Sequence, residues 1–301
     1  MRRLLLFGAV WLLLVAAPAL AQSDSGLSPA LANIKRTHTV RIGYRASSLP
    51  FSFLDQARRP IGYSLELCAA IVDEIGAAVD EPELRIDYVK VTSDDRIAAV
   101  LDDKIDLECG STTANHERRK QVAFSPLTFV AGTKIMVPKA SPVAGISDLK
   151  GKSIVVTKGT TNEQAIRNAD AKLALGLRIV AAADHEESYR LLADGKVEAF
   201  ATDDVLLYGL IAQHKAQDRM KVVGDYLSYD PYGIMFRKDD AQLASAVEAA
   251  FRKLASNHDL LPLYHKWFME RLPTGEKLGV AISPQLEESF RVLDESTGEN
   301  H

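Results

Sequence analysis

The strongest constraint on the fold of this chain is the alternation of strand-like and helix-like segments. Residues 39–44 (TVRIGY) indicate a strand, and residues 63–75 indicate an amphipathic helix whose apolar side chains recur every four residues. Residues 85–91 alternate as a second strand, residues 93–101 open with cap residues and continue as a helix, and residues 105–109 indicate a third strand. This order predicts an α/β fold with a mainly parallel sheet.

The second half of the chain repeats this pattern. Its segments indicate strand and helix in turn: 153–157, 162–174, 178–182, 186–192, 197–201 and 203–213. One weak internal repeat connects the halves, because residues 101–110 (LDDKIDLECG) resemble residues 192–201 (LADGKVEAFA) with a one-residue offset. The sequence therefore predicts two related α/β lobes.

Two extended, β-rich segments, residues 128–137 and 226–235, look like connections between the lobes. If both cross, the chain leaves the first lobe once and returns once, and the two crossings act as a hinge. The predicted boundaries are lobe 1 at residues 22–127 and 233–270, hinge segments at 128–132 and 228–232, lobe 2 at 133–227, and a C-terminal extension at 271–301.

The first 21 residues have the pattern of a secretory signal peptide. A basic pair, Arg2 and Arg3, precedes an apolar run at residues 4–17, and a small-x-small ending predicts cleavage between Ala21 and Gln22. The alternative is an uncleaved membrane anchor, but the apolar run is short for a bilayer span. We therefore predict export of a mature chain.

The charge of the mature chain bears on its partners. Removing the two arginines of the signal peptide changes the formal net charge from −4 to −6. A mildly acidic protein lacks the basic face that nucleic acid requires, so we predict no nucleic-acid partner. The length suffices for one large core or two modest ones.

Two cysteines, Cys68 and Cys109, are present in the whole chain. In an oxidising compartment an isolated pair usually bridges, and closing so long a loop would stabilise the fold by roughly 3–4 kcal/mol. The alternative is two separate buried thiols. No Cys/His cluster surrounds them, so we predict no metal site and no cofactor.

Signatures of catalysis are missing. The chain has neither G-x-S-x-G nor H-E-x-x-H. Residues 145–153 (GISDLKGKS) resemble a phosphate-binding loop, but five residues separate the glycines and the segment precedes a strand instead of following one. We therefore predict a protein that is not an enzyme.

Groups that bind anions are better supplied. Six polar residues follow the ends of the three strands in the first half: Arg45, Ser93, Arg96, Ser111, Thr113 and Arg118. In a parallel α/β sheet these positions share the carboxyl edge, where ligands bind. Arginine binds a carboxylate in a bidentate manner, through two parallel hydrogen bonds, so three arginines suit a molecule with two carboxylates. The alternative is that Arg96, Arg118 and Arg119 are solvated charges on helix faces.

The second half offers complementary groups at the same kind of position. Residues 158–161 (KGTT) follow a strand and open a helix, which makes them a candidate anion site. His185 lies at another strand-to-helix turn, and Asp203 follows a strand and could hold an ammonium group. The alternative is that Thr161 and Asp203 only cap their helices, and Asp204 competes with Asp203.

These motifs, in this order, resemble a known family. Residues 62–72 (GYSLELCAAIV) resemble the signature of the family 3 extracellular solute-binding proteins, the periplasmic amino-acid receptors of ABC importers. The closer likeness is to the glutamate/aspartate-binding subgroup, and it runs from about Ile34 to beyond Trp267. It rests on these stretches: RASSLPFSF, VTSDDRI, ECGSTTANHER, KGTT, DHEES, ATDD, KVVGD, YGIMFRKDD and KWF.

The resemblance implies a two-lobed periplasmic binding protein fold of type II, with two α/β lobes joined by two extended hinge strands. It implies a periplasmic monomer that captures L-glutamate or L-aspartate between closing lobes and delivers it to an inner-membrane ABC permease. The alternative that it leaves open is a periplasmic enzyme on the same fold, of the cyclohexadienyl or arogenate dehydratase kind.

The resemblance also implies a ligand set. It assigns the α-carboxylate to Arg118, with help from Ser111 and Thr161. It assigns the α-ammonium to Asp203 and Thr113. It assigns the side-chain carboxylate to Arg45, Ser93, Arg96 and His185. Arg119 is left as surface charge.

Overall fold

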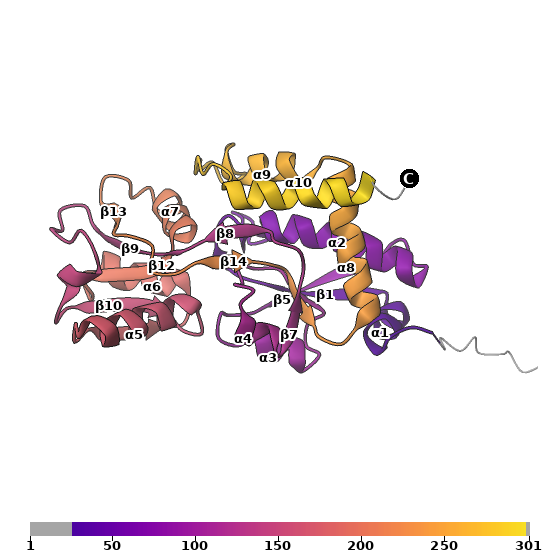
Figure 1. Ribbon diagram of the computed structural model, residues 1–301, viewed down its shortest axis with the longest axis horizontal. Helices are drawn as coiled ribbons and strands as arrows, with labels where there is room; N and C mark the ends of the chain where they lie inside the picture. Colours follow the sequence, from indigo (N-terminus) through magenta and orange to yellow (C-terminus); the bar gives the residue numbers. More distant parts are fainter. Residues whose placement is uncertain (1–25, 299–301) are drawn as a thin grey trace, which may run out of the picture.

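The structure is a computed structural model that describes residues 26–298, so the predicted signal peptide lies outside the described residues. Two α/β lobes lie side by side, and two neighbouring strands, β8 and β14, run between them (Figure 1). The predicted two-lobed α/β fold is confirmed. Within residues 26–298 no helix is both long and apolar enough to cross a membrane.

Lobe 1 is built on a five-stranded mixed sheet. In spatial order its strands are β5 (Arg85–Lys90), β1 (Thr39–Tyr44), β6 (Leu107–Glu108), β15 (Met235–Arg237) and β7 (Val122–Phe124). β1 is parallel to β5 and β6, whereas β15 is antiparallel to β6 and β7. A small antiparallel sheet follows β1: β2 (Ser47–Ser48), β3 (Ser52–Leu54) and β4 (Pro60–Ile61).

Alternation along the strands gives the lobe 1 sheet a core on each face. Phe236 of β15 packs in the large cluster with α2 (Tyr63–Val79) and α8 (Ala241–Ser256), whereas its neighbour Met235 packs in a second cluster with α3 (Arg96–Leu101). The remaining helices of this lobe are α1 (Pro29–Thr37), α4 (His116–Arg119) and α9 (Leu260–Phe268).

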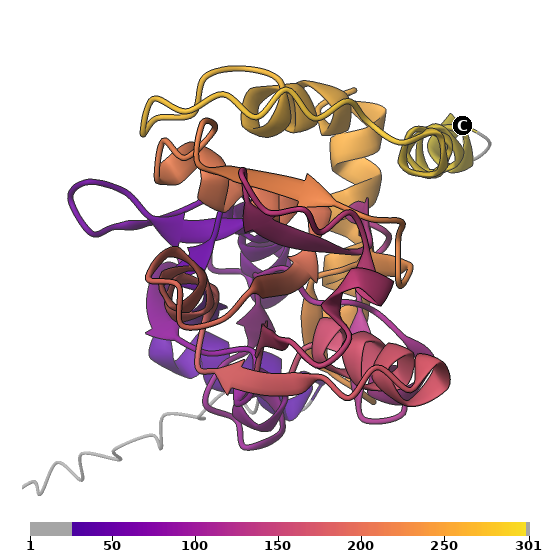
Figure 2. The ribbon, with the colours of Figure 1, turned by 90° about the vertical axis from the view of Figure 1, so that its left-hand side faces the viewer.

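The C-terminal helix α10 (Pro284–Gly298) is an element that sequence patterning missed. It packs against α8 through Leu286 and Phe290, which are both buried, and it lies along the top of the molecule (Figures 1 and 2). Its apolar side chains are few and its other residues are largely polar, so the segment resembles a tail in isolation. Packing on a helix that is distant in sequence makes it part of the fold.

Lobe 2 contains the second five-stranded sheet. In spatial order its strands are β11 (Arg178–Ala182), β10 (Ser153–Thr157), β12 (Ala199–Asp203), β9 (Thr133–Pro138) and β13 (Met220–Val223). Its helices are η1 (Ile146–Leu149), α5 (Thr161–Leu173), α6 (His185–Ala193) and α7 (Asp204–Gln213). All five residues of β10 are buried, as expected for a central parallel strand with a core on each face.

The two crossings are strands that lie far apart in the chain and side by side in the fold. β8 (Phe129–Ala131) pairs antiparallel with β14 (Asp230–Tyr232), and each continues into a strand of the sheet it enters. A Cβ at Gly132, directly after β8, would lie 2.5 Å from the carbonyl oxygen of Ser228, so only glycine lets the crossings approach so closely. Movement of the lobes about these strands, with the predicted boundaries, stays a prediction.

A disulfide joins Cys68 of α2 to Cys109, the residue after β6, which confirms the bridge and excludes two free thiols. It ties the main helix of lobe 1 to the segment that begins at Gly110 and carries Ser111 and Thr113. The crosslink therefore lies directly behind part of the candidate site.

Candidate ligand-binding site

The nine predicted site residues gather where the lobes face each other. They come from the carboxyl ends of strands and the first turns of helices, as a parallel sheet dictates. Seven of them line one cavity of about 10 Å³, whose lining is Ser93, Arg96, Ser111, Thr113, Thr160, Thr161, Asn162, His185, Asp203 and Leu206. This volume holds about one water molecule, so a ligand fits only if the lobes lie further apart than in this structure.

Arg45 lies directly after β1 and is 1% exposed. Its Nη2 donates to the hydroxyl of Ser93 at 2.5 Å, whereas its Nη1 is buried without a hydrogen-bond partner in the described residues. Burial, and then the neighbouring charge of Arg96, lower the pKa of Arg45 to about 10. The guanidinium thus stays charged at neutral pH and retains hydrogen-bonding capacity.

Arg96 is the first residue of α3 and is 2% exposed. Its Nε has no hydrogen-bond partner within residues 26–298, and burial lowers its pKa. The helix begins three residues later than predicted because residues 92–95 form a turn, in which the carboxylate of Asp95 accepts from the N–H of Thr92 at 2.7 Å. That turn leaves Ser93 facing the cleft beside Arg45.

Arg118, in α4, reaches both lobes. Its Nη1 donates to the carbonyl of Thr113 at 3.0 Å and its Nη2 to the carbonyl of Gly159 in lobe 2 at 3.3 Å. Burial, followed by repulsion from Arg96, lowers the pKa of Arg118 to about 9. The solvated-charge alternative is therefore wrong for Arg96 and Arg118, because both are buried.

Asp203 ends β12 on the lobe 2 side of the cavity. Its Oδ1 accepts from the amide of Asn162 at 2.8 Å, and its Oδ2 accepts from the hydroxyl of Tyr232, on the hinge strand β14. Burial, and then the carboxylate of Asp230, raise the pKa of Asp203 to about 8. The side chain makes no capping bond to α7, so it is a buried acceptor rather than a helix cap.

His185 opens α6 and is fully buried beside the arginines. Its Nδ1 shares a hydrogen bond of 2.8 Å with the hydroxyl of Thr157. Burial, and then the charges of Arg45 and Arg96, hold the pKa of His185 well below its usual value. The imidazole is therefore neutral at neutral pH and contributes hydrogen bonding without adding a fourth positive charge.

The lobes touch across the cavity. The hydroxyls of Thr113 and Thr161 lie 3.2 Å apart, and Lys158 forms an ion pair of 2.9 Å with Asp94. Gly159 lies so close to lobe 1 that a Cβ there would be 2.7 Å from the Cα of Asp94. The cap of α5 is Thr160, whose hydroxyl accepts from the backbone N–H of Glu163, so Thr161 is free to face Thr113. The structure is thus a closed form.

Four residues around the site escaped the sequence analysis: Glu108, Asn162, Asp230 and Tyr232. Asp230 accepts from the Thr113 hydroxyl at 3.0 Å, and Tyr232 bonds Asp203, so both come from a crossing strand that was read only as a connector. Glu108 alone had a usable signal, since a carboxylate within a short apolar strand is unusual.

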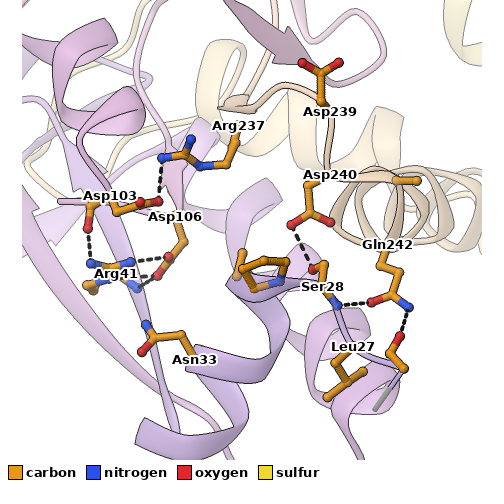
Figure 3. A pocket seen from close by; sticks show the side chains of 14 residues that line it. Leu27, Ser28, Asn33, Arg41, Asp103, Asp106, Arg237, Asp239, Asp240 and Gln242 are labelled. Carbon is orange, nitrogen blue, oxygen red and sulfur yellow. Dashed lines mark hydrogen bonds and ion pairs between the residues drawn. The ribbon is translucent and has the colours of Figure 1, made fainter. Parts of the chain in front are cut away.

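A larger hollow, of about 820 Å³, lies elsewhere on lobe 1 (Figure 3). Its charges satisfy one another: Arg41 pairs with Asp106 at 2.6 Å, and Arg237 pairs with Asp103 at 2.5 Å. These ion pairs leave no buried charge waiting for a ligand, whereas the cleft has unpaired guanidinium nitrogens. Within residues 26–298 no cluster of acidic, histidine or cysteine side chains could hold a metal ion.

Named proteins are similar to this chain over most of its length. A protein of Pseudomonas aeruginosa named L-glutamate/L-aspartate-binding protein is 38% identical over 284 residues, which cover 94% of this chain and 93% of the relative. The glutamate/aspartate import solute-binding protein of Escherichia coli is 35% identical over 265 residues, 87% of this chain and 88% of the relative. Both are named as binding proteins and not as enzymes.

The fold has a solved counterpart. An ancestral arginine-binding protein bound to glutamine matches with a TM-score of 0.69 and 30% identity, over 77% of this chain and 99% of that one. The model of the bacterial extracellular solute-binding proteins, family 3, matches residues 40–270. The resemblance read from the motifs is confirmed, and this chain belongs to family 3 of the bacterial extracellular solute-binding proteins.

Proposed function

We propose that this chain captures glutamate or aspartate between its lobes in the periplasm and delivers it to an inner-membrane ABC permease. The observation that carries the proposal is the group of three buried arginines and one buried aspartate between the lobes, of which Arg96 and Asp203 line the cavity itself. A buried guanidinium without an acceptor is costly, so a ligand that supplies carboxylates gains binding energy there. The glutamate/aspartate names of the relatives support this choice of ligand.

Each charged group of the ligand is assigned to residues of complementary charge or hydrogen-bonding capacity. Arg118 lies beside Thr113 and the first turn of α5, so it receives the α-carboxylate, with Ser111 and Thr161 as neighbours. Asp203 and Thr113 receive the α-ammonium. The side-chain carboxylate lies against the remaining group of four: Arg45, Ser93, Arg96 and His185. A neutral amide in that place carries no negative charge, and its NH2 group would face the donating arginines, which disfavours glutamine.

Closure of the lobes gives the binding its strength. The contacts between Thr113 and Thr161 and between Arg118 and Gly159 exist only when the lobes meet. Closure removes water from the ion pairs, which strengthens them. We propose that export through the N-terminal signal peptide places the protein in the periplasm and that it acts there as a monomer.

Calorimetric titration of the mature protein tests the proposal. The protein is unfolded and refolded to remove any bound ligand, and then titrated with glutamate, aspartate, glutamine, asparagine and arginine. Strong binding of the first two alone is expected. Strong binding of a neutral or basic amino acid would overturn the assignment of the side-chain pocket, and absence of all binding would overturn the proposal.

A further inference from the structure

A buried carboxylate lies behind the three arginines. Glu108 is in β6, in the middle of the lobe 1 sheet, where it pairs with Gly43 of β1 and Met235 of β15. Its side chain is fully buried. Burying a carboxylate costs several kcal/mol unless nearby charges and hydrogen bonds compensate, so its presence in a central strand requires an explanation.

The hydrogen bonds of Glu108 do not explain it. Oε2 accepts from the hydroxyl of Thr112 at 2.6 Å, but Oε1 is buried without a hydrogen-bond partner in the part of the chain that the structure describes. A carboxylate serving only to brace this loop would use both oxygens. The compensation has to come from charge.

That charge is the arginine cluster. Among the acidic groups that raise the pKa values of Arg45, Arg96 and Arg118 against the effect of burial, Glu108 contributes most in each case. One negative charge therefore acts on all three positive ones. The cluster formed by these four side chains keeps an excess of two positive charges.

Glu108 acts on the cavity without touching it. A Cβ at Gly110 would lie 2.4 Å from Oε1 of Glu108 and 2.8 Å from Cγ of Arg45, so the two side chains meet behind this glycine. Glu108 does not belong to the lining of the cavity. Any influence on the ligand must pass through the electrostatic field or through the arginines.

We propose that Glu108 is a specificity-determining residue that sets the charge of the ligand site from behind, and this inference rests on the proposed capture of acidic amino acids. Its carboxylate partly balances the arginines, which lets the ligand-free protein tolerate three buried guanidinium groups. The same carboxylate repels an acidic ligand, so the protein binds dicarboxylates less tightly than the arginines alone would allow. Stability without ligand is gained at the expense of affinity.

The variant Glu108→Gln isolates the charge, because the amide oxygen can still accept from Thr112. We expect glutamate and aspartate to bind about tenfold more tightly, as removal of one nearby buried charge implies. Glutamine, which carries no net charge, should bind as it does to the parent protein. The ligand-free melting temperature should fall, and the rise in melting temperature at saturating glutamate should grow.

The matched control is Glu117→Gln. Glu117 lies in α4 beside Arg118 but its side chain is 75% exposed, so water screens the same change of charge. Titrations of parent, Glu108→Gln and Glu117→Gln with glutamate and glutamine should give an altered ratio of affinities only for Glu108→Gln. Equal changes for both ligands, or weaker glutamate binding, would overturn the inference in favour of a bracing role.

A second variant covers failure of Glu108→Gln to fold. Adding Arg45→Gln removes one positive charge alongside the negative one and should restore folding, whereas a continued failure to fold would contradict charge balance. The outcomes also separate the two proposals. If the parent binds no acidic amino acid, the proposed function fails. If the parent binds them and Glu108→Gln leaves the ratio unchanged, only the role of Glu108 fails.

Discussion

The two walls of the cleft carry charge in different ways. Lobe 1 presents three arginines, which burial leaves charged at neutral pH although it lowers the pKa of each. Lobe 2 presents Asp203 and His185, whose protonation is shifted by burial, upward in pKa for the acid and downward for the imidazole. The charge on the wall of lobe 1 is thus fixed near neutral pH, whereas the groups on the wall of lobe 2 can change protonation when a ligand binds.

The two lobes also differ in the structural elements that support the cleft residues. The disulfide and the C-terminal helix α10 both reinforce lobe 1, and lobe 2 contains no cysteine. Strongly repelling groups need a rigid support if they are to stay close together. The following predictions test this contrast, in order of decreasing expected effect.

Arg118→Ala should remove binding of every amino acid. The substitution takes away the partner of the α-carboxylate, which all amino acids share, and leaves that carboxylate buried without a partner. A loss of about 4 kcal/mol, or a thousandfold in affinity, is expected. Calorimetry with glutamate and glutamine measures it, with the exposed neighbour substitution Arg119→Ala as the control. Retained binding of either ligand would move the α-carboxylate elsewhere in the cleft.

Removal of the disulfide that reinforces lobe 1 should lower the free energy of unfolding more than it changes ligand binding. Cys68→Ser with Cys109→Ser opens a loop of 41 residues, which in the chain-entropy model costs about 4 kcal/mol. Urea unfolding of the double variant should show this loss, and glutamate should recover part of it. Parent-like stability under reducing and oxidising conditions would show that the helices of lobe 1 suffice without the crosslink.

Arg96→Ala should discriminate between ligands. Its guanidinium faces the proposed side-chain carboxylate, so binding of glutamate and aspartate should weaken by about a hundredfold, or about 2.7 kcal/mol. Glutamine binding should change little. If Arg96→Ala binds glutamate as well as the parent does, the proposed side-chain pocket is wrong, although Arg118 could still hold the α-carboxylate.

The titration of Asp203 in lobe 2 should make ligand binding depend on pH. Asp203 has a raised pKa of about 8, so in the ligand-free protein it is protonated below that pH, and its contribution to stability is lost as the pH rises through 8. An ammonium requires the ionised form. Affinity should therefore rise about tenfold per pH unit between pH 6 and pH 8 and then level off.

The control for this slope is Asp203→Asn, which should bind weakly and without the pH dependence. Proton release on binding, measured in buffers of different ionisation enthalpy, should approach one proton at pH 6 and decrease as the pH rises to 8. A parent affinity that is flat from pH 6 to pH 8 would show that Asp203 is already ionised before the ligand arrives.

Sequence patterning predicted the features that are local. The α/β alternation identified the three parallel strands of each sheet but not the antiparallel strands β7, β9, β13 and β15 that complete the mixed sheets. The rule that ligands bind at the carboxyl ends of strands gathered all nine predicted side chains around the cleft. It missed what depends on distant pairing. Tyr232 reaches Asp203 only because a crossing strand passes the cavity, and α10 becomes a stable helix only through its contact with α8.

Charge was also hard to predict from sequence. Arg96 and Arg119 both lie in charged stretches of helix, yet the first is buried and the second has its guanidinium 5.2 Å from the ring of Phe124 on an exposed surface. Nothing in the local pattern distinguishes a buried arginine from a solvated one. The distinction arises when two lobes that are far apart in sequence close over the same edge.

The approach of Gly159 to Asp94 has a mechanical consequence. At this point the two lobes are separated only by backbone, and the φ of Gly159, +75°, is one that other residues rarely adopt. We expect that even a methyl group at this position would keep the two lobes from closing fully. The time for which an amino acid stays bound would then depend on how closely the backbones of the two lobes approach at Gly159.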